Sequence, residues 1–399
     1  MVADRLMTRV RKKIAFGLLV IAVTVATAAY LRPVPEVAGQ AYSSTIPAGK
    51  ELALPWPGYG QAALGASGYG ILSTHGEQKA VPIASVAKII TALAVLERKP
   101  LAASDSGPTI TLTAADVQLF EDYYIRGGSV VRVQNGEKIN QYQALQAMLL
   151  PSGNNIADSL AVWAFGSVPG YVKYANEMLR QMGLTATEVT DASGFSPESV
   201  SNAKELVRLG ERTLSNPVLA GIVSQQSAVV PVAGALNNVN WLLGQEGVIG
   251  IKTGNTDEAG GCFLFAANRT VDNQKVKLIG AILGAPTRDT AISDSRELLR
   301  STDSGFEKKV LIKAGDPVGQ YRAPWGTSTL VVAKNNLEAL IWRESPAELD
   351  ARLISLQPDS EKNTEVGNVT VTVGSQEVSQ KAVLAQSLPG PSWYWRIFR

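Results

Sequence analysis

Two serine–lysine pairs in the sequence have the spacing that brings a hydroxyl and an amine together on a helix. Ser85 and Lys88 are three residues apart, and so are Ser201 and Lys204. In a helix, the Cβ atoms of either pair lie on one face within ~6 Å of each other. A serine hydroxyl becomes an effective nucleophile only when a neighbouring base takes its proton. Spacing alone does not choose between the pairs, although the second is also typical of a helix N-cap at Ser201.

Two downstream motifs distinguish the pairs. Ser152-Gly153-Asn154 follows a helical pattern in a loop, and Lys252-Thr253-Gly254 ends an apolar strand. The order Ser-x-x-Lys, Ser-x-Asn, Lys-Thr-Gly is found in penicillin-binding proteins and serine β-lactamases. This order selects Ser85 as the candidate nucleophile.

The residue types indicate how such a site would work. Lys88 becomes a base if burial and a second cation such as Lys252 lower its pKa. At the start of a helix, Ser85 can also offer its own backbone N–H to a developing oxyanion. The sequence therefore predicts acyl transfer with Lys88 as the base.

Beyond these motifs, the chain resembles the serine-type D-Ala-D-Ala carboxypeptidases, the low-molecular-mass penicillin-binding proteins. The resemblance extends over residues 60–306 and, more diffusely, over the β-rich segment that follows. It is carried by Ala84–Thr91, Gly128–Val130, Leu149–Asn155, Asp191–Phe195 and Gly250–Gly260. It implies a β-lactamase/transpeptidase-like domain and a smaller C-terminal domain.

The resemblance also implies roles that spacing does not provide. Asn255 would supply the second oxyanion N–H, while Ser152 and Asn154 would relay protons and hold the substrate amide. Lys252 and Thr253 would receive the terminal carboxylate, and we include Gly254 with them in the substrate-binding set. The substrates would be peptidoglycan stem peptides, and β-lactams would be covalent inhibitors that acylate Ser85. No metal or other cofactor is implied.

Two positions depart from the pattern of the family. Asn155 follows the Ser-Gly-Asn motif where Asp is frequent, and Asn255 stands where some members have His. Neither change removes a side chain to which we assign chemistry, so we expect them to affect the rate only.

The elements around these motifs predict an α+β fold, with an antiparallel sheet covered by helices. Apolar residues three or four apart predict a helix that starts at Ser85. Largely apolar runs predict strands near 247–252, 262–268 and 275–283, the last two joined by a turn at 272–274. Residues 69–81 suggest two short strands with His75 in the turn between them.

The N-terminus predicts membrane attachment. Basic residues precede 18 uncharged positions from Ile14 to Leu31, at the short end of the ~17–25 residues that span a bilayer. The body of the chain would then be extracytoplasmic, tethered to the membrane or, after cleavage near Ala26-Thr27-Ala28, secreted. Residues 33–60, rich in Pro, Gly, Ser and Ala, suggest a tether.

The remaining boundaries follow from composition. We expect a basic flank, an anchor or signal peptide and the start of the tether in 1–40, the catalytic domain in 41–308, and a β-rich domain in 309–385. Residues 386–399 form an aromatic and basic tail, which suits either a bilayer interface or an ordinary disordered or packed terminus.

Composition narrows the chemistry further. With 37 Lys and Arg against 35 Asp and Glu, the chain has no basic excess for nucleic acid. A single cysteine, Cys262, forms no internal disulfide. The single histidine, His75, leaves one candidate base for a Ser-His-Asp triad, so the serine chemistry is expected to use another base.

We therefore expect a serine-type D-alanyl-D-alanine carboxypeptidase that trims peptidoglycan stem peptides through a Ser85 acyl-enzyme. An endopeptidase or a transpeptidase would use the same residues. A serine β-lactamase is an alternative, with Glu198 as a candidate deacylating base. A catalytically silent wall-binding protein is the other alternative, although it would have no chemical need for the full set of motifs.

Overall fold

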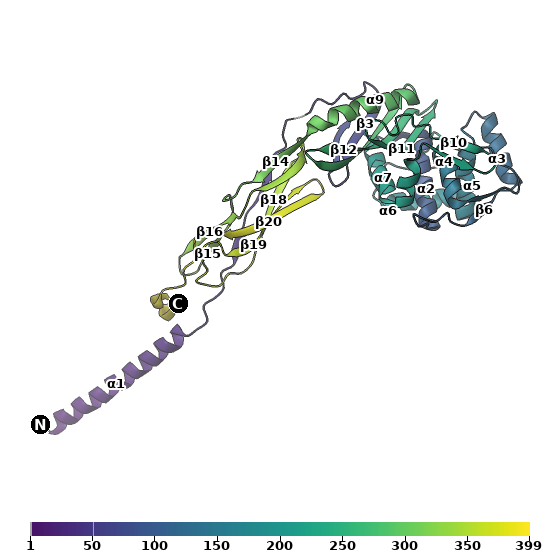
Figure 1. Ribbon diagram of the computed structural model, residues 1–399. Coiled ribbons are helices and arrows are strands. Elements are labelled where there is room, and N and C mark those ends of the chain that lie inside the picture. The colour runs from purple at the N-terminus through teal and green to yellow at the C-terminus, as the bar shows by residue number, and fades with distance from the viewer. Residues whose placement is uncertain (1, 51) are drawn as a thin grey trace. The chain divides into compact units, whose positions relative to one another are not determined.

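A computed structural model describes residues 2–50 and 52–399 of the chain (Figure 1). The described chain divides into two compact units. The α+β unit comprises residues 49–307 and 342–345, and the β-rich unit comprises residues 1–48, 308–341 and 346–399. Residues 41–48, which we expected in the catalytic domain, lie in the β-rich unit.

A five-stranded antiparallel sheet forms the centre of the α+β unit, in the order β11-β12-β13-β3-β4. Its strands are β3 (Gln61–Ala66), β4 (Gly70–His75), β11 (Val248–Thr256), β12 (Gly260–Val271) and β13 (Gln274–Ala285). The expected hairpin between β12 and β13 is present. Its turn residues Asp272 and Asn273 both have positive φ, as short twisted hairpins require.

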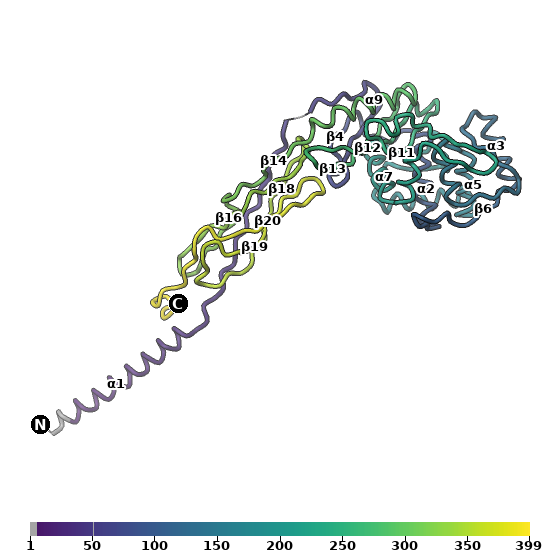
Figure 2. Tube along the Cα trace, in the orientation of Figure 1, coloured from purple at the N-terminus to yellow at the C-terminus, as the bar shows by residue number. Residues whose placement is uncertain are grey.

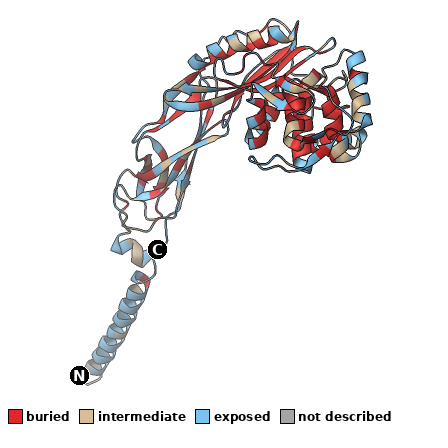
Figure 3. Ribbon diagram, turned by 45° about the vertical axis from the view of Figure 1, so that its right-hand side comes forward, coloured by how far each residue is buried: buried red, intermediate tan, exposed pale blue. Residues whose placement is uncertain are grey.

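Helices lie on both faces of this sheet, with α9 on one side and α7 on the other (Figure 1). The helices of this unit are α2 (Lys88–Arg98), α3 (Ala114–Ile125), α4 (Gln141–Leu149), α5 (Asn154–Phe165), α6 (Val168–Gln181), α7 (Ala203–Ser215), α8 (Pro217–Val223) and α9 (Arg288–Ser301). The first nine residues of α2, Lys88–Leu96, are all buried. Figure 3 shows that several helices of this unit are largely buried. A helix buried all round holds its side chains in fixed positions.

Short elements connect these parts. A 3-10 turn, η1 (Ala84–Ala87), leads into α2, and a second, η2 (Thr302–Gly305), follows α9. Three short antiparallel pairs are formed by β5 (Val81–Pro82) with β8 (Val200–Ser201), β6 (Thr109–Thr111) with β7 (Lys138–Asn140), and β9 (Ser227–Val230) with β10 (Gly234–Asn237).

Two local predictions in this unit are wrong. Residues 70–75 form one strand that includes His75, which we expected in a turn, because β4 pairs with β3 along this whole length. His75 ends this strand and stacks on Trp56 with ring centroids 5.8 Å apart. The N-cap of α7 is Asn202 rather than Ser201, since its side chain accepts a hydrogen bond from Glu205 N at 2.8 Å and Ser201 belongs to β8.

The β-rich unit contains a seven-stranded sheet in the order β1-β15-β16-β20-β19-β18-β2. Its strands are β1 (Gly39–Ala41), β2 (Ser43–Ile46), β15 (Pro317–Arg322), β16 (Ser328–Ala333), β18 (Ala347–Leu353), β19 (Glu365–Val373) and β20 (Gln376–Leu384). A separate pair joins β14 (Phe306–Ile312) and β17 (Leu337–Trp342). The alternating valines of β19 are buried, as in a sheet with one face on a core.

Part of the expected tether is also incorporated into this sheet. Gly39 pairs with Tyr321, and Ile46 pairs with Ala347. Figure 2 shows the purple N-terminal segment running beside the later strands. The segment lacks a strong strand pattern, and its partners come almost 300 residues later, so local composition did not indicate the pairing.

The N-terminal helix α1 (Val2–Tyr30) contains a span, Leu6–Tyr30, that is long and apolar enough to cross a membrane. The C-terminal helix α10 (Trp393–Phe398) contacts α1. The Arg396 guanidinium lies 4.9 Å from the centre of the Tyr30 ring, and Arg399 donates to the carbonyl oxygens of Arg32 and Pro33 at 2.8 and 3.0 Å. The aromatic tail is therefore packed at the end of the apolar helix.

Candidate active site

Ser85 and Lys88 form a contact through the turn that starts α2. Ser85 lies in η1, and Lys88 is the first residue of α2. The distance from Lys88 Nζ to Ser85 Oγ is 2.8 Å. The hydroxyl and the amine are thus within hydrogen-bonding distance, as a nucleophile and its base must be.

Two further acceptors hold the Lys88 amine. Lys88 Nζ donates to Asn154 Oδ1 at 2.7 Å and to the carbonyl oxygen of Ser193 at 2.8 Å. Both of these oxygens only accept hydrogen bonds. Ser85 Oγ is the one partner of the three that can also donate a proton to the amine.

Burial controls the charge of Lys88. The side chain is completely buried, and burial lowers its pKa to about 7. The negative charges of Asp191 and Asp158 act in the other direction and raise the pKa, but burial has the larger effect. We expected Lys252 to contribute to this shift, but the leading charges acting on Lys88 are these two carboxylates, which favour the ammonium. A substantial fraction of Lys88 is neutral near pH 7.

Lys252 is also buried, on the central part of β11. Burial is the main cause that lowers its pKa, and the charges of Lys88 and Arg288 add to the effect. Its Nζ donates to the carbonyl oxygen of Thr253 at 2.9 Å. An anionic ligand nearby would favour the protonated form of Lys252.

β11 lies directly against the turn that carries Ser85, and Gly254 permits this approach. A Cβ atom at Gly254 would lie 2.9 Å from the carbonyl oxygen of Ile83 and 3.1 Å from Ser85 N. A larger residue would separate the strand from the nucleophile. Packing therefore explains the glycine of the Lys-Thr-Gly motif.

The Ser-Gly-Asn motif forms the turn between α4 and α5. Ser152 has a φ of 68° and is buried, and its Oγ has no hydrogen-bond partner among the described residues. Asn154 begins α5 and accepts the bond from Lys88. The motif thus contributes the Asn154 side chain, which is hydrogen-bonded to Lys88, and the Ser152 hydroxyl, which has no hydrogen-bond partner among the described residues.

Asn155, the first departure from the pattern, has a structural role. Its Oδ1 accepts from Val131 N at 3.0 Å, and its Nδ2 donates to the carbonyl oxygen of Val131 at 2.9 Å. The neighbouring Asn154 N donates to the carbonyl oxygen of Ser129 at 2.8 Å. Together these bonds fix the 129–131 loop beside the site.

A small cavity of about 60 Å³ lies next to Ser85. Its lining residues are Ser85, Ser129, Pro151, Ser152, Val239, Thr253, Gly254, Asn255 and Arg288. All three motifs contribute to this lining.

Sequence reasoning missed Arg288, the first residue of α9. Its backbone N donates to Asn255 Oδ1 at 3.2 Å, and its side chain is 41% exposed. The residue lies 36 positions after Lys252 in no motif that we considered. Only the packing of α9 against the sheet brings it to the cavity.

The 191–199 loop shapes the other side of Lys88. Asp191 accepts hydrogen bonds from Ser193 Oγ at 2.7 Å, Phe195 N at 2.9 Å and Ser199 Oγ at 2.6 Å. Gly194 has a φ of 70°, and a Cβ there would lie 1.9 Å from the carbonyl oxygen of Ala84. The loop thereby presents the Ser193 carbonyl to the amine.

A buried acid, Asp158, also acts on this site. Tyr123 Oη donates to Asp158 Oδ2 at 2.9 Å and lies 3.4 Å from Ser193 Oγ. Burial raises the pKa of Asp158 to about 6, although the Tyr123 hydrogen bond and the charges of Lys88 and Arg126 oppose the shift. Neither Tyr123 nor Asp158 was predicted as part of the site.

Other candidates lie outside the site. Cys262 is buried, and burial raises the pKa of its thiol to about 12, which disfavours the reactive thiolate. Glu198, the carboxylate considered for a β-lactamase, is exposed and does not line the Ser85 cavity. Within residues 2–50 and 52–399, no three His, Cys, Asp or Glu side chains cluster as metal ligands would.

Comparison with known proteins places these features in a family. The family model for D-alanyl-D-alanine carboxypeptidase matches residues 65–287. A D-alanyl-D-alanine endopeptidase of Pseudomonas aeruginosa is 28% identical over 246 residues, which cover 59% of this chain and 74% of the relative. A D-alanyl-D-alanine carboxypeptidase of Mycobacterium tuberculosis is 30% identical over 206 residues, covering 50% of this chain and 66% of the relative.

Solved structures support the same fold. Penicillin-binding protein 5 from Haemophilus influenzae aligns over 90% of this chain and 98% of its own, with a TM-score of 0.57 and 20% identity. A Streptomyces DD-transpeptidase aligns over 61% of this chain and 96% of its own, with a TM-score of 0.55 and 23% identity. The predicted β-lactamase/transpeptidase-like α+β fold is confirmed.

Since the family model covers more than half of the chain, from the first sheet strand to the start of α9, the protein belongs to the D-alanyl-D-alanine carboxypeptidase family of serine peptidases.

Proposed function

We propose that this enzyme removes the terminal D-alanine of peptidoglycan stem peptides through an acyl-enzyme on Ser85, with Lys88 as the base. The observation that carries the assignment is the Lys88 amine, which is buried, has a pKa of about 7 and lies 2.8 Å from the Ser85 hydroxyl. Each step below uses side chains of the described site.

Attack begins from neutral Lys88. Its two N–H bonds point to Asn154 Oδ1 and the Ser193 carbonyl, which only accept, so the lone pair is left for Ser85. The Ser85 proton passes to Nζ as Oγ bonds to the carbonyl carbon between the last two D-alanines. The resulting ammonium has three donors and three partners, and this arrangement stabilises the charge that forms.

The oxyanion of this intermediate needs two N–H donors. We assign them to the backbone of Ser85 and of Asn255, which line the same cavity. Gly254 supports this assignment because it brings β11 against Ser85 N. Donors fixed in this way need no reorganisation when the charge develops.

Collapse of the intermediate breaks the C–N bond, and the leaving amine takes the proton that Lys88 received from Ser85, which returns Lys88 to its neutral form. We assign this proton relay to Ser152, whose buried Oγ is free of other partners among the described residues. Water then attacks the ester with the same base, and the Ser85 hydroxyl is restored. The products are free D-alanine and a shortened stem peptide.

The terminal carboxylate of the substrate requires cations and hydroxyl donors. Thr253 and Arg288 line the cavity, and Lys252 is buried beside Thr253 on β11. Binding of a carboxylate would favour the charged form of Lys252, whose pKa is low in the free site. We therefore assign carboxylate recognition to these three residues.

A labelling experiment tests the function. The full chain in lipid nanodiscs is incubated with a fluorescent penicillin and, separately, with a peptide ending in D-Ala-D-Ala. We expect stable label on the protein and release of D-alanine, both lost in Ser85→Ala. Ser201→Ala is the matched control from the second serine–lysine pair, and it should retain both signals.

The outcomes discriminate between the alternatives. Rapid penicillin turnover without D-alanine release would indicate a β-lactamase. Intact labelling without turnover of the peptide, but with cleavage of a crosslinked dimer, would indicate an endopeptidase. Absence of both labelling and turnover would contradict the assignment of an enzyme.

We also propose that the enzyme is tethered to the outer face of the cytoplasmic membrane. The apolar span Leu6–Tyr30 supports this, together with basic residues that precede residue 14, since positive flanks stay cytoplasmic. At the other end of the span, the exposed rings of Trp393, Tyr394 and Phe398 lie on α10, which packs against α1. Aromatic residues at that level favour a membrane–water interface.

Fractionation of cells tests the tether. The full chain should remain with membranes after a carbonate wash and be degraded by protease added from outside. Release of the intact enzyme into the medium would contradict retention of the N-terminal helix.

A further inference from the structure

A second cavity lies in the α+β unit, and it shares no residue with the cavity at Ser85. Its volume is about 620 Å³, within the range of ~300–1,000 Å³ that holds small-molecule ligands. Its lining comes from the end of α2, the end of α6 with the turn after it, and α7 with the start of α8. On α2 the lining begins at Leu93, five residues beyond Lys88, which corresponds to ~7.5 Å along this helix.

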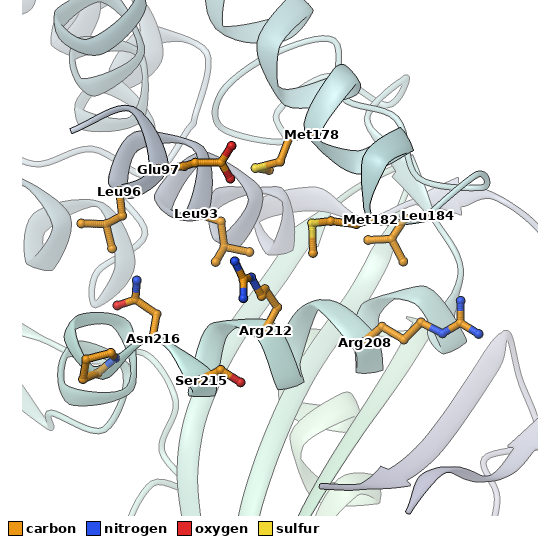
Figure 4. Close-up of a pocket in the computed structure, with 11 residues that line it drawn as sticks. Leu93, Leu96, Glu97, Met178, Met182, Leu184, Arg208, Arg212, Ser215 and Asn216 are labelled. Carbon is orange, nitrogen blue, oxygen red and sulfur yellow. The ribbon is translucent and has the colours of Figure 1, made fainter. Parts of the chain in front are cut away.

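Apolar side chains form one side of this cavity. The relative solvent exposures of Leu93, Met178 and Leu184 are 8%, 5% and 1%. The half-buried Met182 lies beside them. Figure 4 shows these side chains converging above α7 from two other helices. Methionines adapt their shape to flexible apolar groups, so this side of the cavity suits an alkyl chain.

Two arginines form the opposite side. Arg208 and Arg212 lie one turn apart on α7, and Figure 4 shows Arg212 extending from this helix towards Leu93. Both are exposed, and within the described part of the chain neither forms an ion pair or a side-chain hydrogen bond. The Arg208 side chain extends the other way along α7, so the two guanidinium groups do not meet (Figure 4). Each still provides unused donors for an anion.

The other polar groups of the lining leave this positive charge in excess. Glu97 is the one carboxylate, and it already accepts a hydrogen bond from Tyr174 Oη at 2.7 Å. Asn216 Oδ1 accepts from Val218 N and Leu219 N, so its amide hydrogens remain available as donors. Two cations against one carboxylate give the cavity a net positive charge.

We propose that this cavity binds a single-chain alkyl carboxylate, with its headgroup on Arg212, its chain against the leucines and methionines, and Arg208 adding positive charge at the rim. Arginines without a carboxylate partner lie opposite apolar side chains in this cavity. This combination favours an amphipathic anion over a neutral or cationic molecule. The site is separate from the catalytic residues and does not depend on the assigned reaction.

Hydrogen exchange of the full chain in zwitterionic nanodiscs tests the proposal. The probes are octanoate, octylammonium and octanol, which share a chain length and differ in charge. Octanoate should slow amide exchange in peptides covering 174–186 and 204–218, whereas octylammonium and octanol should not. Protection by all three probes, or by none, would overturn the proposal. A second set of nanodiscs contains anionic lipid and no octanoate. Protection there, without protection by octanoate in zwitterionic nanodiscs, would assign the site to a lipid headgroup and would also overturn the proposal.

Matched variants of α7 locate the contact. Arg208→Gln with Arg212→Gln should weaken octanoate binding about tenfold or more, because the charge-assisted contact with Arg212 and the nearby charge of Arg208 are both lost. Lys204→Gln removes one charge from the same helix outside the cavity and should change binding less than about twofold. Since all three positions are exposed, the fold is retained, and labelling by penicillin verifies it. Equal binding by the double variant and the control would exclude the arginines as the headgroup site.

Discussion

The two serine–lysine pairs have the same spacing but lie in different environments. Lys88 is completely buried, with hydrogen bonds to Ser85, Asn154 and Ser193. Lys204 is exposed on α7. Its partner Ser201 lies in β8, with its Oγ 2.7 Å from Thr187 Oγ1. The shared pattern therefore brings a hydroxyl and an amine to neighbouring positions and does nothing more.

The difference arises from elements far away in the sequence. α5 contributes Asn154 and the 191–199 loop contributes Ser193. These two acceptors hold an amine whose pKa is lowered by burial, so that part of it is unprotonated at neutral pH. No comparable elements cover Lys204. A catalytic lysine in this fold is thus defined by what encloses it rather than by its distance from a serine.

Removal of each amine should produce the largest contrast between the pairs. Lys88→Met should slow acylation of Ser85 by ~10²–10⁴-fold, the usual contribution of a general base. Lys204→Met should leave the rate within about twofold. Stopped-flow measurement with a fluorescent penicillin checks both, and similar losses in the two variants would contradict the assignment of Lys88 as the base.

Gly194 tests whether the loop that presents Ser193 is required. In Gly194→Ala, the new Cβ would meet the Ala84 carbonyl at 1.9 Å, so we expect loss of most acylation and a lower unfolding temperature. Gly183 has the same φ of 70° with open space around it. Gly183→Ala should therefore show backbone strain alone, about 1–2 kcal/mol, with acylation unchanged. Equal effects in both variants would show that only strain matters.

The pH dependence of acylation should follow the protonation of Lys88. Because its pKa is lowered to about 7 and only the neutral amine accepts a proton, the rate should rise through about pH 7 to a plateau. Below the midpoint it should fall ~tenfold per pH unit. A rate independent of pH between 5 and 9 would exclude the amine as the base.

Asp158→Asn should change this profile slightly. The Asp158 charge raises the pKa of Lys88, so its removal should move the midpoint downward, by less than ~1 pH unit for a single charge of this kind. The amide oxygen of the variant can still accept from Tyr123, which preserves the local geometry. An upward shift, or none, would show that Asp158 does not act on Lys88 electrostatically.

Much of the fold follows from local patterns. The hairpin of β12 and β13, the helix after Ser85 and the α+β arrangement agree with their apolar periodicity. Strands β1, β2 and β3 were missed, because short strands without clear alternation form only when distant partners are present. The N-cap of α7 was misplaced by one residue for a similar reason. Ser201 pairs with Val81 in a short sheet, so the helix begins after Asn202.

The sequence by itself determined the candidate nucleophile, because three motifs in order distinguish Ser85 from Ser201. It also determined the residue types available for catalysis. Only the tertiary structure decided that Lys88 is buried among acceptors, that Arg288 reaches the cavity, and that Asp158 and the 191–199 loop act on the amine. The physical reason is that spacing specifies neighbours along the chain, whereas a pKa depends on solvent exclusion and charges brought together from the whole fold.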